Sequence, residues 1–556
     1  MSREEFIRDP AGWSMRFMSG EREQRRAAGE WTGKTVADYA RQRAGEQPDA
    51  VAVRGETGAM TYAELLAEAQ ALARGMLAAG VKRGETVSFQ LPNWLEAVVV
   101  NLACALAGIV VVPVIPIYRQ AELRFILKDC RARMLFIPQS FRSIDYPQMI
   151  DSLRGELPDL RDVVVVRGAA DGMSRYQDMI ETGRQSSAEL RAGDPDDAKF
   201  LIYTSGTTGQ PKGVIYSHNQ SRRPVWASMT VWGISPGAGI LMPSPVTHVT
   251  GYSYGLEAAF TFGLRVTLME KWDAAAAARL IDEHGIEFMI GATPFLQELV
   301  EEAERTGSRL PSLKIFACGG AAVPPDLIRR ASKVFANCTA FRVFGSSECP
   351  MVTQGVLDDP ELAATTDGRI FDWEVKVVDG DGNKVANGME GEILACGPSL
   401  FRGYTSAEAN RESFDAEGYF RTGDLGIVTA DGLLTITGRK KDIIIRGGEN
   451  LSAKEIEDAL HEHPAIREAA VVAMPHERLG EGVCAWLVAA GAAQPGQAEL
   501  YAYLTQAGLA RQKCPEWVEY IAELPKTASG KVKKHELRRM IAQKIAREQR
   551  GSTQSA

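Results

Sequence analysis

The 556-residue chain is 45% hydrophobic, and because a single core stops growing at about 250–300 residues, this length predicts two or three domains. The net charge of −8 and the scattered basic residues exclude a protein built to bind nucleic acid or an anionic membrane surface. Eight cysteines without a CxxC pair and seven histidines without a ligand cluster exclude a disulfide framework and a zinc site.

The N-terminus is charged, reading Met-Ser-Arg-Glu-Glu, and no apolar signal-peptide core follows it. We therefore expect a cytoplasmic protein with reduced thiols. Residues 97–117 are apolar enough to resemble a membrane span, but they are interrupted by Asn101, Gly108, Pro113 and Pro116. The pattern instead predicts a buried helix over residues 95–106, stopped by Gly108, and a core strand over residues 109–114, with no membrane span.

Short β-rich segments alternate with amphipathic helical patterns, as over residues 62–79 and 274–284. The β-rich segments are residues 134–137, 163–166, 201–203, 288–290, 315–318 and 342–344. Such alternation predicts an α/β fold with buried sheets. Beyond residue 374 the pattern changes to short strands separated by Gly/Asp turns, which predicts a small antiparallel subdomain.

The main domain boundary is expected near residues 439–442, because about a hundred residues with their own strand and helix signals follow them. We predict an N-terminal core domain over residues 1–438, a linker over 439–442 and a C-terminal domain over 443–549. The polar tail, residues 550–556, is expected to be disordered.

A loop rich in glycine and hydroxyl groups, residues 203–213, is the most informative segment of the chain. Its glycines allow backbone amides to converge on an anion, and its side chains add further donors. Apolar segments before and after it are typical of a phosphate loop between two strands. It is not a Walker loop, since no glycine directly precedes its lysine, and a plain surface loop is the alternative. The candidate phosphate ligands are Thr204, Ser205, Gly206, Thr207, Thr208, Gly209 and Lys212.

Four further motifs occur in a fixed order after this loop. They are Phe-Gly-Ser-Ser-Glu at 344–348, Thr-Gly-Asp at 422–424, Gly-Arg at 438–439 and Pro-Lys-Thr-Ala-Ser-Gly-Lys at 525–531. Taken singly, Asp424 would be a turn residue, and Arg439 and Lys531 would be solvated surface cations. Taken together, the five motifs resemble the adenylate-forming superfamily, which includes acyl-CoA synthetases, aryl-CoA ligases, luciferases and peptide-synthetase adenylation domains.

The resemblance covers about residues 35–545 and implies a large N-terminal domain of two α/β subdomains and one antiparallel β subdomain, followed by a mobile α+β C-terminal domain. It also implies a two-step reaction. A carboxylate attacks the α-phosphate of ATP to give an acyl-adenylate and pyrophosphate, and the thiol of CoA then displaces AMP. Such chemistry needs cations and oriented dipoles around the phosphates.

The resemblance further implies a role for each motif residue. The loop residues and Lys212 would hold the β- and γ-phosphates, and Glu348 with Thr207 would hold Mg²⁺ through oxygen ligands. Asp424 and Arg439 would bind the ribose, and Lys531 would bridge the α-phosphate and the attacking carboxylate. Phe344 would stack on the adenine without the hydroxyl that tyrosine carries there, next to Gly345, Ser346 and Ser347.

Lys441 lies where this family has its hinge, about which the C-terminal domain rotates between the two steps. Rotation is needed because Lys531 and the pantetheine thiol approach the substrate from the same side. In the rotated state Gly447 and Gly448 would contact the pantetheine, since glycines allow a close backbone approach. A simple hairpin is the alternative interpretation of these glycines.

The acceptor is expected to be CoA, because only 25 residues follow Lys531 and these are too few for a fused carrier domain. Residues 243–251 contain no acidic side chain, which disfavours amino acids as substrates. His248 is expected to flank the substrate carboxylate, although a buried core histidine is the alternative. The predicted walls of the acid pocket are Thr250, Tyr252, Ser253, Gly319, Gly320, Ala321, Val323, Val343 and Met351.

This mostly small and apolar set predicts a neutral acyl group from a cyclic, aryl-alkanoic or medium-chain acid. Residues 113–119 are also similar to ligases of alicyclic and arylalkanoic acids. Arg342 departs from the small or amide residue that many relatives have near the adenine, which puts the contacts there in question. The expected partners are a small carboxylate and CoA, and a homodimer is left open.

Three other functions are alternatives to the CoA ligase. An acyl-AMP ligase that loads a separate carrier protein differs only in its acceptor. A luciferase-type oxygenase shares the adenylation step and would be exposed by light emission or oxygen uptake. A non-catalytic nucleotide-binding protein predicts eroded motifs, whereas Lys212, Glu348, Asp424, Arg439 and Lys531 are all present.

Overall fold

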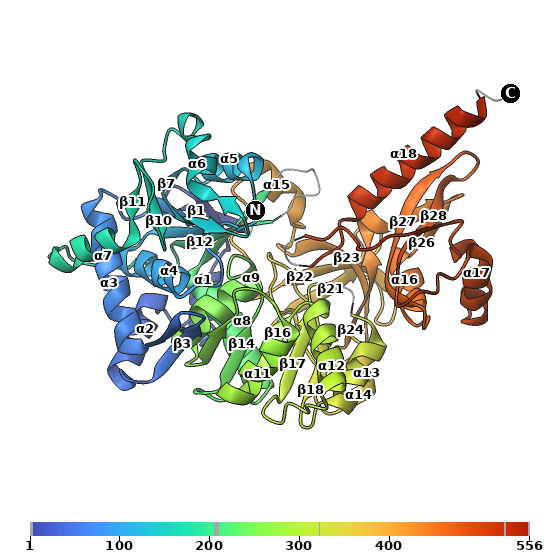
Figure 1. Ribbon diagram of the computed structural model, residues 1–556, viewed down its shortest axis with the longest axis horizontal. Helices are drawn as coiled ribbons and strands as arrows, with labels where there is room; N and C mark the ends of the chain where they lie inside the picture. The colour runs from blue at the N-terminus through green and yellow to red at the C-terminus, as the bar shows by residue number, and fades with distance from the viewer. Residues whose placement is uncertain (1–3, 205–210, 322, 528–529, 554–556) are drawn as a thin grey trace.

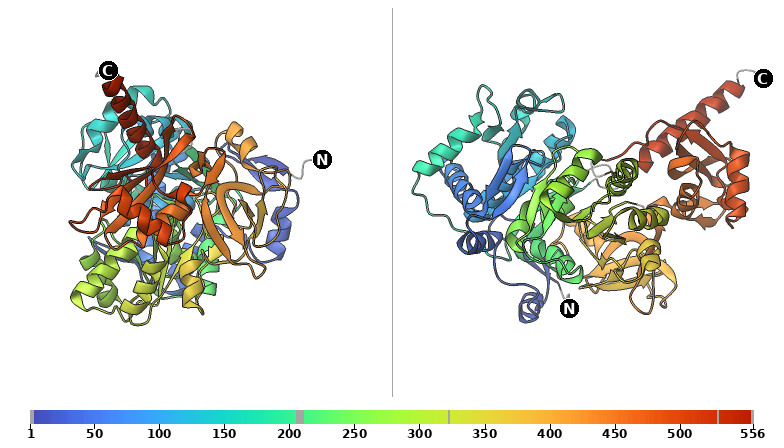
Figure 2. Two further views of the ribbon diagram at one scale, coloured as in Figure 1. Left: turned by 90° about the vertical axis from the view of Figure 1, so that its right-hand side faces the viewer. Right: turned by 60° about the horizontal axis from the view of Figure 1, so that its bottom comes forward.

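The computed structural model describes residues 4–204, 211–321, 323–527 and 530–553 (Figure 1). A large N-terminal domain of two mainly parallel sheets and an antiparallel sheet precedes a smaller C-terminal domain, so the predicted fold class is confirmed. The right-hand view of Figure 2 shows the C-terminal domain as a separate lobe at one end of the molecule. Within the described ranges, none of the helices combines the length and apolarity that crossing a lipid bilayer requires.

The first sheet has seven strands and ends in the pair that flanks the glycine-rich loop. All neighbours are parallel except that last pair. In spatial order the strands are β11 (Ser174–Arg175), β10 (Asp162–Val166), β7 (Ala132–Pro138), β5 (Thr86–Phe89), β6 (Val110–Pro113), β12 (Ala198–Thr204) and β13 (Lys212–Ser217). The helices joined to this sheet include α4 (Leu95–Ala107), α5 (Gln120–Asp129), α6 (Tyr146–Asp151) and α7 (Tyr176–Gln185).

The second sheet also has seven strands, parallel except for the hairpin of its last two. In spatial order they are β18 (Thr339–Val343), β17 (Ile315–Gly319), β16 (Ile286–Gly291), β14 (Gly239–Met242), β15 (Arg265–Leu268), β3 (Val51–Gly55) and β4 (Gly58–Thr61). Its helices include α2 (Val36–Glu46), α3 (Tyr62–Ala78), α8 (His218–Val231), α11 (Ala274–His284), α12 (Thr293–Thr306), α13 (Pro325–Val334) and α14 (Pro360–Thr365).

The antiparallel sheet has the order β21 (Glu374–Val378), β22 (Glu390–Cys396), β23 (Phe420–Val428) and β24 (Leu434–Arg439). A 3₁₀ turn, η3 (Lys440–Asp442), follows β24 and leads into the C-terminal sheet. That sheet consists of β26 (Glu449–Leu451), β25 (Ile444–Arg446), β28 (Gly480–Ala489), β27 (Ile466–His476) and β29 (Trp517–Tyr520). Helices α16 (Ala453–His461), α17 (Gln497–Gln506) and α18 (Lys534–Thr553) accompany it, and the end of α18 projects away from the sheet (Figure 1).

Local sequence signals explain where several of these elements begin and end. Helix α3 begins at a capping box, in which the Thr61 side chain accepts from the Glu64 N–H and the Glu64 side chain accepts from the Thr61 N–H. Helix α4 is buried on all sides and ends at Gly108, which has φ 65° in the left-handed region. The apolar segment over residues 97–117 is thus a core helix followed by a core strand, as predicted.

Candidate functional site

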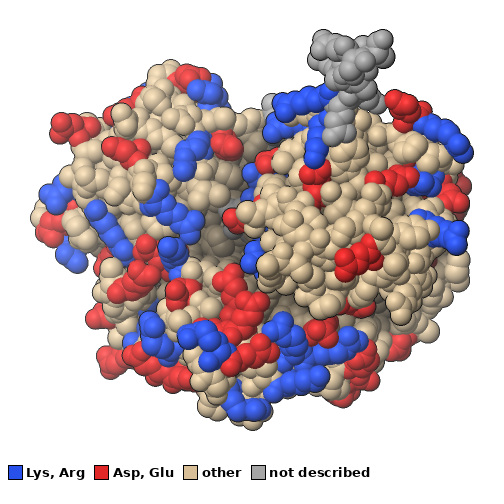
Figure 3. All heavy atoms as spheres, turned by 45° about the vertical axis from the view of Figure 1, so that its right-hand side comes forward, with Lys and Arg blue, Asp and Glu red and all other residues tan. Residues whose placement is uncertain are grey.

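A cavity of about 2130 Å³ lies between the N-terminal and C-terminal domains. Figure 3 shows the molecule hollowed at this place. Strands β18, β23 and β24, the turn η3 and helix α16 contribute to its lining, as does the segment before α18. Of the predicted site residues, the lining includes Thr204, Lys212, Gly320, Ala321, Val323, Val343, Phe344, Gly345, Ser346, Ser347, Glu348, Asp424, Arg439, Lys441 and Lys531.

The glycine-rich loop is held at both ends by one strand pair. Thr204 at the end of β12 pairs with Lys212 at the start of β13, in antiparallel register. The Lys212 ammonium lies 5.1 Å from the ring centroid of Tyr404, which contributes a cation–π contact. The predictions for Ser205, Gly206, Thr207, Thr208 and Gly209 lie outside the described residues. The two loop ends nevertheless face the cavity together.

Two hydroxyl groups orient the carboxylate of Glu348. Tyr404 donates to its Oε1 at 2.8 Å and Ser346 donates to its Oε2 at 2.9 Å. Burial raises the pKa of the Tyr404 hydroxyl, and the neighbouring Glu348 raises it further, so this hydroxyl stays protonated as a donor. Each carboxylate oxygen keeps a second lone pair, which is the type of ligand that Mg²⁺ prefers.

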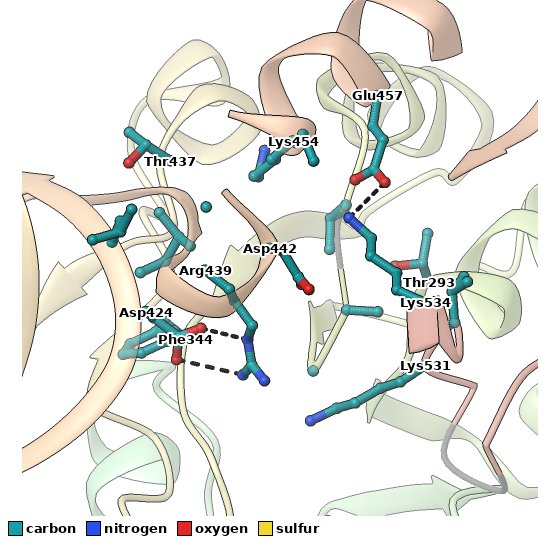
Figure 4. A pocket seen from close by; sticks show the side chains of 18 of the residues that line it. Thr293, Phe344, Asp424, Thr437, Arg439, Asp442, Lys454, Glu457, Lys531 and Lys534 are labelled. Carbon is teal, nitrogen blue, oxygen red and sulfur yellow. Dashed lines mark hydrogen bonds and ion pairs between the residues drawn. The ribbon is translucent and has the colours of Figure 1, made fainter. Parts of the chain in front are cut away.

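Asp424 and Arg439 face each other across the β23–β24 pair. The Arg439 Nε lies 2.6 Å from Asp424 Oδ1, and Arg439 Nη2 donates to Oδ2 at 3.4 Å. Burial raises the pKa of the Asp424 carboxyl, whereas Arg439 and Lys531 oppose this shift. The two cations thus hold a buried carboxylate in the cavity wall (Figure 4).

Lys531 reaches the same space from the C-terminal domain. A tight turn positions it: the Thr527 N–H donates to the Lys531 carbonyl at 2.7 Å, and Gly530 takes a positive φ of 82°. Figure 4 shows its side chain extending toward the space occupied by Arg439 and Asp424. Burial lowers the pKa of Lys531, and Arg439 lowers it further, while Asp424 and Glu348 act in the opposite direction. An anion placed between these cations would therefore be strongly attracted.

Arg342, the residue that departs from the family pattern, is held by Asp367, a carboxylate that belongs to none of the predicted motifs. Its Nη2 donates to both oxygens of Asp367 at 2.7 and 2.8 Å, its Nε donates to Oδ1 at 3.1 Å and its Nη1 to the Ala364 carbonyl at 3.2 Å. Asp367 also accepts from the Ile436 N–H at 2.8 Å, which ties β18 to β24. The pair explains an arginine beside Phe344, whose ring is buried.

The predicted acid pocket is only partly brought together. Gly320, Ala321, Val323 and Val343 line the cavity, whereas its lining does not include His248, Thr250, Tyr252, Ser253, Gly319 or Met351. Gly319 is constrained by packing, because a Cβ there would come within 2.5 Å of the Val343 carbonyl. Gly447 and Gly448 also lie outside the lining and form the turn between β25 and β26, with φ of 58° and 89°.

Tyr252 is committed to a buried polar network instead. Its hydroxyl donates to Asn101 Oδ1 at 2.6 Å and accepts from Lys199 Nζ at 2.5 Å, while Lys199 forms an ion pair with Glu257. Tyr252 and Glu257 begin and end a π-helical turn, η2 (Tyr252–Glu257). Since a π-helix repeats near i+5, both side chains fall on one face toward Lys199. Lys199 and Glu257 belong to none of the predicted motifs, so the sequence alone gives no signal for this pair.

Replacing Lys199 with methionine is expected to destabilise the fold by about 3–5 kcal/mol, because Glu257 would remain as an unpaired buried charge. Both side chains are at most 1% exposed. The double variant Lys199→Met/Glu257→Leu removes both charges and should recover most of the loss. Urea unfolding of the three proteins measures this. Equal destabilisation by the single and double variants would contradict the charge argument.

His248 is a neutral imidazole at physiological pH. Burial, followed by the nearby charge of Lys531, lowers its pKa from 6.5 to about 4. His218, also buried, has its pKa lowered well below 6.5, and its Nδ1 accepts from the Val36 N–H at 3.2 Å. Below pH 6.5 the unfolded chain therefore binds protons that the folded chain does not.

This difference makes stability depend on pH in the window between about 6.5 and 4. The contribution of both histidines is present above pH 6.5 and is lost as the pH falls toward 4. His218→Asn, whose amide oxygen can accept from the Val36 N–H, should flatten the fall in melting temperature between pH 7 and pH 5. An unchanged pH slope in this variant would show that His218 is protonated equally in both states.

Comparison with known proteins gives a consistent assignment. The AMP-binding enzyme family matches residues 40–405, and the AMP-binding enzyme C-terminal domain matches residues 455–531. The chain is 36% identical to the medium-chain fatty-acid–CoA ligase of Escherichia coli K12, over 95% of this chain and 94% of that one. It is 33% identical to the vibriobactin-specific 2,3-dihydroxybenzoate-AMP ligase of Vibrio cholerae, over 93% and 95% of the two chains.

Solved structures are similar over nearly the whole chain. The o-succinylbenzoate CoA synthetase of Bacillus subtilis, solved with its acyl-adenylate intermediate, has a TM-score of 0.77 at 27% identity, covering 91% of this chain and 98% of that chain. An anthranilate CoA ligase in complex with anthranoyl-AMP, at 23% identity, shows the same fold with a TM-score of 0.83 over 92% and 98% of the two chains. The chain therefore belongs to the AMP-binding enzyme family, as the resemblance to the adenylate-forming superfamily predicted.

Proposed function

We propose that this enzyme is an ATP-dependent carboxylic acid–CoA ligase that forms an acyl-adenylate and then an acyl-CoA. The observation that carries the proposal is the convergence of Glu348, Asp424, Arg439 and Lys531 on one cavity between the two domains. Glu348 and Asp424 come from the N-terminal domain, Arg439 is the last residue of β24 at the start of the linker, and Lys531 comes from the C-terminal domain. The two cations suit the phosphates of a nucleoside triphosphate, and the two carboxylates suit its ribose and a metal ion.

In the first step the enzyme must bring two anions together. Lys531, with its side chain desolvated, would neutralise the α-phosphate and the attacking carboxylate at once, and Lys212 would hold the outer phosphates. Asp424 would accept from the ribose hydroxyls, and Arg439 would keep that carboxylate ionised and oriented. Phe344 would supply the stacking face for the adenine, and neutral His248 would flank the carboxylate without adding charge.

Glu348 is the described residue that suits a metal ligand, with Thr207 as its proposed partner in the loop. Its carboxylate is ordered by two hydroxyl donors and retains free lone pairs. Bound Mg²⁺ would neutralise phosphate charge in the adenylation step. Tyr404 and Ser346 would orient the carboxylate for this role.

The second step would use a rotated C-terminal domain, with residues 1–438 as the stationary part and Lys441 as the hinge. In the present arrangement Lys531 faces the cavity, which suits adenylation, and Gly447 and Gly448 lie outside the cavity lining. Rotation would exchange them and admit CoA. A cytoplasmic location and small-molecule partners are part of this proposal.

The proposed acid is an apolar cyclic, aryl-alkanoic or medium-chain carboxylate. Small apolar residues at 320, 321, 323 and 343 line the cavity. The relatives include the medium-chain fatty-acid–CoA ligase and an indoleacetate–CoA ligase of Aromatoleum aromaticum, 30% identical over 92% of this chain and 99% of that one. Both names describe an apolar acyl group, which supports this class for the chain.

Pyrophosphate release from ATP and Mg²⁺ tests the proposal, measured across alkanoic, cyclohexane and aryl-alkanoic acids with and without CoA. We expect one class to give pyrophosphate, AMP and thioester. No pyrophosphate with any acid would contradict adenylation. Pyrophosphate and acyl-AMP without thioester would favour the second candidate, an acyl-AMP ligase that loads a carrier protein. The 2,3-dihydroxybenzoate-AMP ligase relative, which is named for an acid–AMP product, supports the adenylating step of this candidate.

A further inference from the structure

The turn η3 joins the N-terminal domain to the C-terminal domain and consists of only Lys440, Lys441 and Asp442. Strand β24 precedes it in the antiparallel sheet, and β25 follows it in the C-terminal sheet. Its first residue, Lys440, forms an ion pair with the N-terminal domain, and its last residue, Asp442, forms one with the C-terminal domain. The central residue, Lys441, is the proposed hinge.

The N-terminal side of the turn is fixed by Glu392 of β22. Lys440 Nζ lies 3.1 Å from Glu392 Oε2, and Arg421 of β23 lies 3.5 Å from the same oxygen. The Glu392 side chain is 8% exposed, so its position is set by the sheet around it. Lys440 is therefore attached to the N-terminal domain.

The C-terminal side of the turn is fixed by Arg538 of α18. Arg538 Nη2 donates to Asp442 Oδ1 at 2.6 Å and to the Lys441 carbonyl at 3.3 Å. Leu537 and Ile541 of the same helix are fully buried in a core cluster with β27 and β28. Arg538 thus attaches the peptide group between Lys441 and Asp442 to the C-terminal domain.

We infer that these two ion pairs, Lys440–Glu392 and Arg538–Asp442, clamp the chain on both sides of Lys441 and confine domain rotation to the backbone dihedrals that lie between them. The peptide group that Arg538 holds moves with the C-terminal domain, and Lys440 stays with the N-terminal domain. Only ψ of Lys440 and φ and ψ of Lys441 then remain to absorb the rotation. The inference rests on the proposed two-step function, in which that rotation occurs.

A different contact crosses the turn and belongs to neither clamp. Ser452 Oγ, at the start of α16, donates to the Thr437 carbonyl of β24 at 2.7 Å. Rotation of the C-terminal domain must break this hydrogen bond, because the bond joins the two domains directly. The two clamping ion pairs, in contrast, each hold the linker to a single domain and persist through the rotation. Their role is to place the hinge at Lys441, and their loss should spread the rotation over the dihedrals of neighbouring residues.

A proline at residue 441 provides the test. Proline fixes φ near −65°, which a 3₁₀ turn tolerates, so the present arrangement should survive while rotation is opposed. With intact clamps, Lys441→Pro should lower acyl-CoA turnover by about 100-fold, the factor expected when proline costs about 3 kcal/mol at the moving residue. Pyrophosphate release and acyl-AMP formation should change by less than about threefold, since they use the present arrangement.

Adding Arg538→Gln to Lys441→Pro should restore turnover by about tenfold. The backbone dihedrals of Asp442 and its neighbours are then free to change during the rotation. A coupling of this size is usual for residues in contact. Arg538→Lys, which keeps a cation beside Asp442, should restore less. Asp442→Asn opens the same clamp from its other side and replaces Arg538→Gln if that variant does not fold. Lys544→Gln is the matched control, since Lys544 lies on the same helix as Arg538 and pairs with Glu519 of β29 at 2.6 Å.

Relief by Arg538→Gln or Asp442→Asn, but not by Lys544→Gln, would support the clamp. Strictly additive effects, with no relief from either clamp variant, would overturn it. Failure of the proposed function gives another result, because the wild-type enzyme would then form no thioester from any acid. Wild-type turnover therefore separates the two outcomes before any variant is compared.

Discussion

Lys531→Ala is expected to lower pyrophosphate release by about 10³-fold, the upper range for loss of one group that stabilises developing charge in a closed site. The physical reason is the position of this ammonium in the cavity near Asp424, Arg439 and Glu348. Thioester formation from supplied acyl-AMP should change by less than about fivefold, since it would use the rotated arrangement, in which Lys531 is withdrawn. Single-turnover assays of the two half-reactions measure this split.

Lys526→Ala is the control for Lys531. It belongs to the same segment and pairs with Glu468 of β27 at 2.5 Å, within the C-terminal domain. Its loss should leave the two half-reactions in their wild-type ratio. Equal losses in both half-reactions of Lys531→Ala would contradict the role proposed for this lysine.

Glu348→Gln is expected to lower adenylation by about 10²-fold, a factor typical of losing one group that acts on developing charge. Glutamine keeps the size of the side chain and one oxygen that can accept from Tyr404 or Ser346. It removes the negative charge, which should weaken metal binding most. Pyrophosphate release measured over a Mg²⁺ titration should therefore show a raised Mg²⁺ requirement as well as a lower maximum.

Tyr404→Phe separates charge from orientation at the same position. It removes the 2.8 Å hydrogen bond to Glu348 but leaves the carboxylate ionised. We expect a smaller loss and a nearly unchanged Mg²⁺ requirement, since the main ligand is retained. If Glu348→Gln left the Mg²⁺ requirement unchanged, the metal role of Glu348 would be wrong.

Local patterns were sufficient to predict much of the fold. Helical periodicity predicted residues 62–79 and 274–284, where α3 and α11 are found, and Gly108 ends α4 as expected. Such features depend on neighbours within one or two turns, so a single sequence contains the necessary information. The same is true of the strand pair around the glycine-rich loop.

Long-range polar pairs could not be predicted in this way. Arg342 and Asp367 are 25 positions apart, and Tyr252 and Asn101 are 151 apart. Their partners are chosen by tertiary packing, and a lone arginine or lysine gives no signal of burial. The π-helical turn at Tyr252 is a further example, since one extra residue in a turn redirects a side chain that α-helical spacing would place elsewhere.

The Arg538–Asp442 contact also limits how the chain can be recombined. These residues are 96 positions apart, at opposite ends of the C-terminal segment, yet the Arg538 side chain donates a hydrogen bond directly to Asp442. A chimaera joined between them would combine an aspartate from one parent with an arginine from another, each adapted to a different helix placement. A crossover placed directly after Lys440 would leave Lys440 with Glu392 and transfer Lys441, Asp442, helix α18 and Lys531 together. We therefore expect exchanged domains to remain active when they are joined at this breakpoint.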